Sequence, residues 1–348
     1  MPDPTVVGQD APTLVDGGML HMFMLRFDMR APANGAPAPD LYQAAIEMCE
    51  WGETRGAFAT VVCEHHSSSD GYLPSPLILA SAIAARTKTL PISVSVVLLP
   101  LYDPVRLAEE MIVLDHISRG RVMYTAAIGY RPVEYEMYGV DYKRRGKISD
   151  EKLTILLQAK TGQPFDHDGR HIHVTPPPFT PGGPIVSWGG GSVPAARRAG
   201  RFGLGFFAQT NGQDLEDAWT EAMREGGHEV HPGMLQLSDP EMPSTVFVAD
   251  DVDAAWAELG PYLMNDVLMY GEWNKGNDNV ASISFAQTAE ELRAENKSHV
   301  VITVDEAVER VRSGIPLMLH PLIGGLPPEI AWRYLNTVVD EVMPKVGG

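Results

Sequence analysis

The segment CEHHSSS, from Cys63 to Ser69, sets a carboxylate and two imidazoles side by side where an apolar run ends. Glu64, His65 and His66 can exchange protons near neutral pH, so all three are candidates for general acid/base chemistry. Three kinds of site use such groups: a metal centre, a hydrolytic relay, and a proton-handling corner beside a bound cofactor.

A metal centre needs ligands that converge on one ion. If the segment is extended, His65 and His66 point to opposite faces and do not hold one ion together. The sequence contains neither an HExxH nor a CxxC motif. A further histidine group, His167, His171 and His173, falls in an expected loop excursion. We therefore expect no catalytic metal.

A hydrolase needs an activated nucleophile. No GxSxG elbow occurs in this sequence, so a serine nucleophile lacks its usual turn. Cys63 lies two residues from His65, but this spacing on a strand does not by itself form a thiol–imidazole hydrogen bond. The cofactor site is the reading that these residues favour.

A glycine-rich turn offers a place for a phosphate. In PIVSWGGGSVPAARRAG a strand leads into Gly189, Gly190, Gly191 and Ser192, and a helix follows. Glycines let backbone amides approach an anion, and the helix start adds a positive dipole end. The same glycines can also simply close a strand–helix corner. The basic cluster at 143–145 is either counter-charge or a solvated helix start.

The elements that must position these groups alternate between apolar runs and segments of helical period. Strands are expected at 19–25, 57–63, 92–99, 121–129, 183–188, 203–209, from 245, and at 316–322. Eight strand–helix units predict an α/β fold, a TIM (β/α)8 barrel, whose strand C-termini build the active site. Asp103 and Pro104 are expected to start the helix after the third strand.

Two segments depart from this repeat. Residues 163–184 are rich in His, Pro and Gly and predict an extended excursion or hairpin. Residues 261–297 show a weak pattern and predict an inserted lid or interface segment. We expect one domain over 1–348 that carries both excursions.

The amino-acid composition limits the kinds of binding partner that we expect for this protein. The formal charge of −18 repels phosphate backbones and anionic lipid, so neither nucleic acid nor a membrane surface is expected. The longest apolar run, 91–102, is far shorter than the roughly 20 residues of a membrane-spanning helix. The two cysteines lie in apolar segments and the N-terminus shows no signal pattern, which favours a reducing cytoplasm.

Several stretches together resemble one family. EHH, ARTKTL, LPLYDPVRLAEEMIVLDHISRGR, EYEMYGVDYKRR and the glycine-rich turn are similar to the bacterial luciferase-like flavin-dependent monooxygenases. The resemblance runs from about 44 to 205 and returns at PLMLHPLIGGLPPE. It implies a TIM barrel of the luciferase-like type that binds reduced FMN, or the deazaflavin coenzyme F-420, in the barrel mouth.

The resemblance also implies roles for single residues. His65 would act as general acid/base near the flavin, with Glu64 and His66 beside it. The groups expected to hold the cofactor are Ser95 and Val96 in a third-strand bulge that often carries a cis peptide, Gly129, Gly189, Gly190, Gly191 and Ser192 at the strand ends, and Arg144 or Arg145 as the phosphate arginine.

The expected activity is oxygenation of a small organic substrate, with oxygen and with reduced flavin from a separate flavin reductase. Hydride transfer from a reduced deazaflavin, and a non-catalytic flavin-binding protein, remain alternatives. The resemblance further implies a homodimer. Luciferases carry Cys-Arg-Gly where this chain has Ala127, Ile128 and Gly129, so light emission is not expected.

Overall fold

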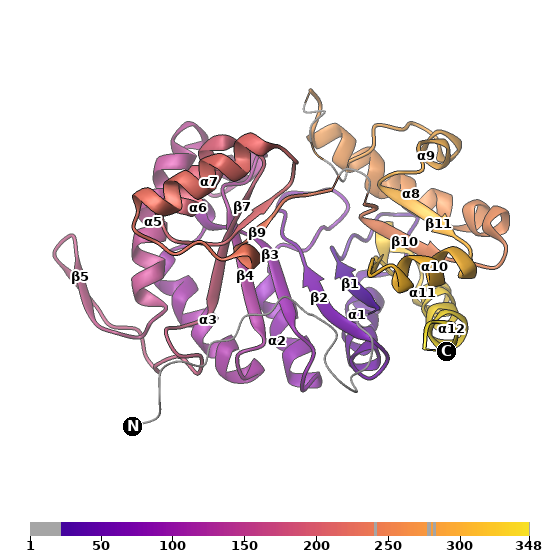
Figure 1. Ribbon diagram of the computed structural model, residues 1–348, viewed down its shortest axis with the longest axis horizontal. Coiled ribbons are helices and arrows are strands. Elements are labelled where there is room, and N and C mark those ends of the chain that lie inside the picture. Colours follow the sequence, from indigo (N-terminus) through magenta and orange to yellow (C-terminus); the bar gives the residue numbers. More distant parts are fainter. Residues whose placement is uncertain (1–21, 240–241, 277–279, 281–282, 348) are drawn as a thin grey trace.

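The computed structural model describes residues 22–239, 242–276, 280 and 283–347. Its main sheet has eight parallel strands that curl through the centre of the molecule (Figure 1). Their order across the sheet is β12 (Leu317–Leu319), β1 (Phe23–Phe27), β2 (Ala57–Val62), β3 (Ile92–Leu98), β4 (Val122–Ala127), β7 (Ile185–Gly190), β8 (Phe206–Ala208) and β9 (Leu235–Gln236).

Helices follow the strands and cover the outer face of the sheet. They are α1 (Ala38–Glu53), α2 (Pro76–Arg86), α3 (Pro104–Ser118), α5 (Arg145–Ala159), α6 (Val193–Arg201) and α7 (Gln213–Glu225), whereas α4 (Pro132–Met137) lies at the C-terminal ends of the strands, where Glu134 meets His65. The alternation of parallel strands with helices confirms the predicted α/β barrel class. Met19–His21 of the first expected strand lie outside the described residues.

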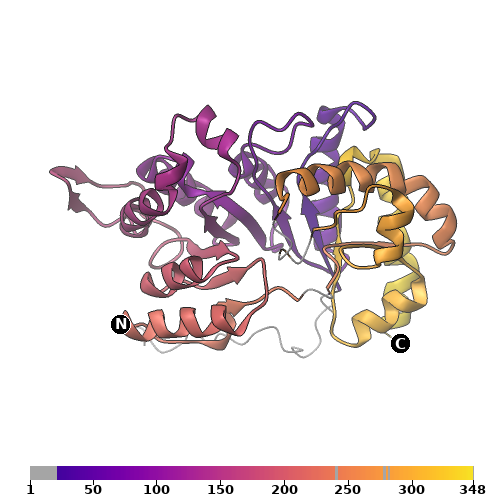
Figure 2. The ribbon, with the colours of Figure 1, turned by 90° about the horizontal axis from the view of Figure 1, so that it is seen from above.

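The hydrogen-bonded sheet among the described residues ends at β9 on one side and β12 on the other. β10 (Thr245–Val248) lies beside β12 but pairs with β11 (His299–Ile302) as a separate parallel pair. The helices α8 (Val252–Trp273), α9 (Ala289–Glu295), α10 (Val304–Arg312), α11 (Pro328–Thr337) and α12 (Met343–Val346) gather around this pair (Figure 2). The strand at 299–302 was not predicted.

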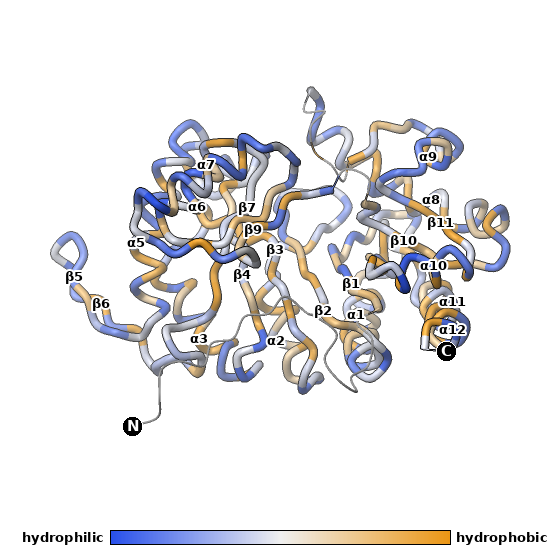
Figure 3. The backbone as a smooth tube through the Cα atoms, viewed as in Figure 1, coloured by the Kyte–Doolittle hydropathy of each residue, from blue (hydrophilic) through white to orange (hydrophobic). Residues whose placement is uncertain are grey.

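Both departures from the repeat contain structure. β5 (Phe165–His167) and β6 (Arg170–Ile172) form the antiparallel hairpin of the first excursion, which projects from the body with a hydrophilic tip (Figures 1 and 3). The second excursion begins inside a helix, because α8 continues past Pro261 to Trp273. Leu259, Leu263 and Val267 are buried on this helix, so tertiary packing outweighs the cost of an internal proline.

The helix after β3 starts as predicted. The Asp103 side chain accepts hydrogen bonds from the amides of Val105 and Arg106 at 3.0 and 2.9 Å, and Pro104 is the first helical residue. No helix among the described residues is long and apolar enough to cross a bilayer. Both cysteines are buried free thiols.

Candidate active site

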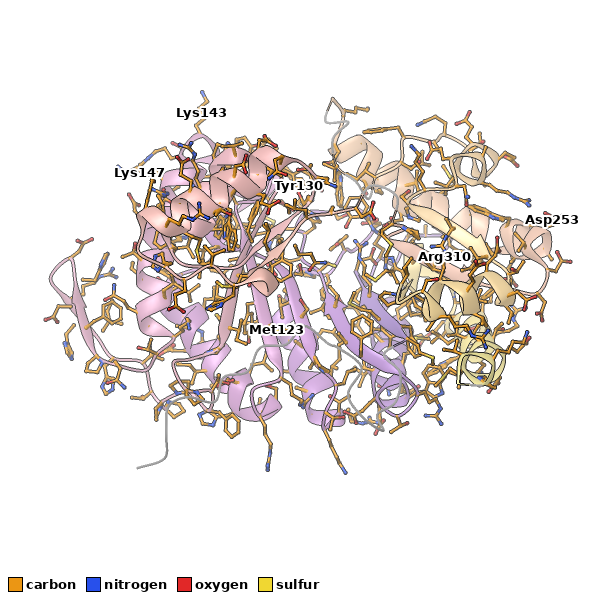
Figure 4. The ribbon with its side chains drawn as sticks, viewed as in Figure 1. Met123, Tyr130, Lys143, Lys147, Asp253 and Arg310 are labelled. Carbon is orange, nitrogen blue, oxygen red and sulfur yellow. The ribbon has the colours of Figure 1, made fainter. Side chains whose placement is uncertain are left out.

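The C-terminal ends of the parallel strands bring the predicted site residues to one edge of the sheet. His65 follows β2, the Ser95–Val96 pair lies in β3, and Gly190 ends β7. Figure 4 shows Tyr130 near this edge, whereas Met123 at the start of β4 lies toward the opposite edge. β2 and β7 are three strand positions apart, which is about 14 Å along the sheet.

His65 lies in a chamber of aromatic side chains and is only 7% exposed. Its Nδ1 is 2.8 Å from Glu134 Oε1, and its Nε2 is 3.4 Å from the Tyr130 hydroxyl. The rings of Tyr72 and Trp273 each lie 4.9 Å from the imidazole ring. Because the ionised carboxylate only accepts hydrogen bonds, Nδ1 of the neutral imidazole carries the proton and Nε2 keeps its lone pair.

The surroundings of His65 favour its neutral form. Burial lowers the pKa of the imidazole, and the hydrogen bond to Glu134 opposes that shift only in part. Burial raises the pKa of Glu134, but the contacts from His65, the His66 amide and the Arg131 guanidinium outweigh it, so the net pKa lies below the usual range. The pair therefore consists of a carboxylate and a neutral base at physiological pH.

Glu64 and His66 form a second pair that is separate from this chamber. His66 Nε2 lies 2.7 Å from Glu64 Oε1, which also accepts a hydrogen bond from the Tyr102 hydroxyl at 3.0 Å. The amide of Leu98 donates to the other Glu64 oxygen at 3.1 Å. As the sequence predicted, the two adjacent imidazoles have different surroundings. Through these contacts, the Glu64 side chain connects the end of β2 with the end of β3.

The loop after β4 supplies groups that no motif indicated. Arg131 Nη1 donates to the His66 carbonyl at 2.5 Å and to Glu134 at 3.1 Å. Its guanidinium carbon lies 3.9 Å from the ring centre of Trp273. Arg131 thus joins three separate segments around His65, which no local pattern could reveal.

A buried arginine holds the loops on the other side of the chamber. Arg30 Nε lies 3.1 Å from Asp28 and 3.3 Å from Asp266, and Nη1 contacts Asp70. Asp266 in turn lies 3.1 Å from His299. These carboxylates come from the end of β1, the loop after β2, and α8. One guanidinium therefore fixes three segments of the rim.

The same guanidinium stacks on the aromatic chamber. Its central carbon lies 4.7 Å from the Tyr72 ring centre, 4.8 Å from that of Tyr270 and 4.8 Å from that of Trp273. The hydroxyls of Tyr72 and Tyr270 are 2.8 Å apart. The sequence did not indicate Arg30 as a site residue.

The third strand contains the expected bulge. The Ser95–Val96 peptide is cis, and the register with β4 shifts between Ser95 and Val97. A Cβ on Gly189 would lie 3.4 Å from Val96 Cγ1 and 3.0 Å from Thr125 Cγ2. β3, β4 and β7 therefore meet closely at this point, where a larger side chain at 189 would not fit.

The glycine-rich turn leaves amides available. Within the described residues, the amides of Ser192 and Val193 donate no recorded hydrogen bond, and Ser192 makes no side-chain cap. A Cβ on Gly191 would lie 3.1 Å from Thr210 Cγ2. These free donors at the start of α6 suit an anion. Gly129, by contrast, has φ +71° beside Leu98 and serves the turn after β4.

The two candidate phosphate arginines differ. Arg144 is exposed, whereas Arg145 is half-buried and its guanidinium carbon lies 4.0 Å from the Tyr142 ring centre. The Arg145 Nε atom is buried without a hydrogen-bond partner. Arg198 of α6 donates to the carbonyl of Gly146 at 3.1 Å, so the first turn of α5 is tied to the helix that carries the free amides.

Comparison with known proteins finds relatives along much of the chain. The chain is 26% identical over 284 residues to the 4-hydroxyprotoasukamycin monooxygenase of Streptomyces nodosus, covering 77% of this chain and 75% of that one. The chain is also 32% identical to two proteins of Sinorhizobium fredii. These two matches span only 38% and 40% of the relatives' lengths.

Solved structures share the fold. The oxygenating constituent of 3,6-diketocamphane monooxygenase from Pseudomonas putida, in complex with FMN, aligns with TM-score 0.68, 21% identity, and coverage of 94% of this chain and 99% of that one. An F420-dependent secondary alcohol dehydrogenase aligns with TM-score 0.63, 14% identity, and coverage of 92% and 99%. The family model described as luciferase-like monooxygenase matches residues 20–311, and the chain belongs to this family.

Proposed function

We propose that this protein is a flavin-dependent monooxygenase that uses reduced flavin and oxygen on a small organic substrate. The observation that carries the proposal is the position of the neutral His65 imidazole, in a water-poor aromatic chamber on the same sheet edge as the free amides of α6. The C-terminal edge of the sheet therefore carries both a group that can transfer protons and backbone amides that can bind the phosphate of a cofactor.

The residues present fit FMN. The Ser192 and Val193 amides and the unpartnered Nε of Arg145 are suited to its phosphate. The close junction of β3, β4 and β7 around Gly189 leaves a backbone surface on which a flat ring system can rest. When bound, the reduced flavin supplies the electron pair that lets oxygen be split between the product and water.

Residues of this chain can transfer a proton to and from the substrate chamber and can keep water out of it. Glu134 accepts the hydrogen bond of Nδ1 of His65, so the Nε2 lone pair faces the chamber beside the Tyr130 hydroxyl and can accept a proton and return it. The rings around it restrict water, which protects reactive groups and strengthens hydrogen bonds there. Glu64 and His66 act as positioning residues because their polar atoms bind one another.

FMN is the cofactor that we propose, and a separate flavin reductase is its proposed source. The FMN complex of a protein with the same fold supports this choice. Hydride transfer from the deazaflavin coenzyme F-420 is the second candidate, because an F420-dependent dehydrogenase also shares the fold. A homodimer remains a proposal that rests on family membership.

The test supplies purified protein with reduced FMN, isotopically labelled oxygen and a panel of small organic compounds. We expect a product that contains one labelled oxygen atom by mass spectrometry, and its loss in His65→Ala while FMN still binds. Reduction of a substrate by reduced deazaflavin, or oxidation of a substrate by oxidised deazaflavin, without label in the product would instead establish the second candidate.

A further inference from the structure

Arg26 points into the curled sheet, toward the proposed substrate chamber. Its neighbours on β1, Phe23 and Leu25, face α1: a Cβ on Gly52 would lie 3.1 Å from Leu25 Cδ1, and the Phe23 ring lies 6.3 Å from that of Trp51. Because side chains alternate along a strand, Arg26 projects from the opposite face, which is the inner face of the sheet.

The Arg26 guanidinium makes no ion pair in the part of the chain that the structure describes, although the charges of Asp28 and Asp266 lie farther away. Its Nη2 donates to the Tyr270 hydroxyl at 3.2 Å, and no described carboxylate oxygen lies within 4.0 Å of it. Arg30 nearby has three carboxylate partners. Arg26 is half-buried, and among the described residues one hydrogen bond is found for its five N–H donors, so the others can bind a ligand.

Arg26 is also close to the proposed proton-handling residue. It bonds the Tyr270 hydroxyl, which lies 2.8 Å from that of Tyr72. The Tyr72 ring lies 4.9 Å from the His65 ring. Two tyrosines, Tyr270 and Tyr72, therefore connect the guanidinium to the imidazole, so both groups border the same aromatic chamber.

We propose that Arg26 binds the carboxylate of the substrate, and that the substrate is a small organic acid with an apolar or aromatic body. A guanidinium matches a carboxylate through two parallel hydrogen bonds, and the tyrosine and tryptophan rings suit an apolar body. The inference deepens the proposed function, since it names the substrate class of the same chamber.

A flavin phosphate does not account for Arg26. The free amides of α6 follow β7, and β1 is four strand positions away from β7, about 19 Å along the sheet. The anion at Arg26 is therefore a different group from the anion at Ser192. The two anion positions leave the space between them for the flavin ring and the substrate body.

The experiment measures binding of benzoate, benzamide and inorganic phosphate to the flavin-free protein by titration calorimetry. We expect benzoate to bind at least about tenfold more tightly than benzamide, and more tightly than phosphate. Arg26→Met should abolish the preference for benzoate, and Arg26→Lys should retain part of it. Arg55→Met is the matched control, because Arg55 is likewise half-buried but lies just after α1, against the ring of Trp51.

The inference would be overturned by equal binding of benzoate and benzamide, by no binding of either, or by an unchanged preference in Arg26→Met. Phosphate binding that requires Arg26 and exceeds benzoate binding would also overturn it, because Arg26 would then serve the flavin. Circular dichroism shows whether Arg26→Met is folded. Binding of FMN to the wild type is measured separately, so failure of the proposed function is distinguished from failure of the carboxylate site.

Discussion

Nδ1 of His65 lies 2.8 Å from Oε1 of Glu134, and both groups are buried. This pair connects the end of β2 with α4 and leaves the other imidazole nitrogen facing the chamber. A carboxylate in this position orients the ring and selects its tautomer. Glu134 is thus a positioning residue for His65, and its removal should change how the imidazole titrates.

We expect Glu134→Gln to lower the pKa of His65 further, because the carboxylate is the main group that opposes the effect of burial. A reaction that needs neutral His65 is lost as the pH falls through this pKa, so the acid limb of the rate profile should move to lower pH. The maximal rate should fall about tenfold or more. A pH–rate profile of Glu134→Gln that coincides with that of the wild type would contradict the role of Glu134. The control variant is Glu136→Gln, on the exposed face of the same helix.

Ser192→Asp should have opposite effects on the stability of α6 and on the affinity for FMN. A carboxylate at the start of α6 suits the helix dipole, so stability should be unchanged or higher. The same charge repels a phosphate, so FMN affinity should fall about tenfold or more, while riboflavin affinity stays the same. Ser192→Asn is the neutral control. Equal losses of FMN and riboflavin binding would show that the amides do not hold the phosphate.

Arg145→Met and Arg144→Met should differ. Arg145 has a buried Nε without a partner and lies in the turn tied to α6, whereas Arg144 is exposed. We expect Arg145→Met to weaken FMN binding about tenfold and Arg144→Met to change it little, as followed by fluorescence titration. A larger loss in Arg144→Met than in Arg145→Met would indicate that Arg144, not Arg145, binds the phosphate.

Arg30→Met should destabilise the fold strongly. The substitution leaves the buried carboxylates of Asp28 and Asp266 without their cation, and breaking such a pair costs about 3–5 kcal/mol. Urea unfolding measures the loss. Arg333→Met, which removes an exposed pair with Glu258, should cost less than about 1 kcal/mol. Similar losses for both variants would contradict the central place of Arg30.

The sequence predicted the strands and the rim because each apolar run ends where polar residues begin. His65, Ser95, Val96 and Gly190 were placed at one edge by that pattern alone or by the resemblance to the family, and the structure brings them to that edge. The predicted excursion from 261 begins inside a helix, because residues 261–273 continue α8. A proline signals a break locally, whereas the burial that overrides it depends on distant packing.

The partners of these residues could not be predicted, because they lie far away along the chain. Glu134 is 69 residues from His65, and Tyr270 is 244 residues from Arg26. One sequence shows neither pairing, since each depends on which strand ends and helix ends become neighbours. The glutamate lies in EYEMYGVDYKRR, a stretch that carried the resemblance, and this was the only signal for it.

The most direct measurement is an NMR titration of His65 with and without reduced FMN. If the flavin ring binds beside the imidazole, FMN should shift the His65 ring signals and change its pKa, while His167 and His171 in the β5–β6 hairpin stay unchanged. Binding of reduced FMN that leaves His65 unchanged would place the flavin elsewhere and contradict the account.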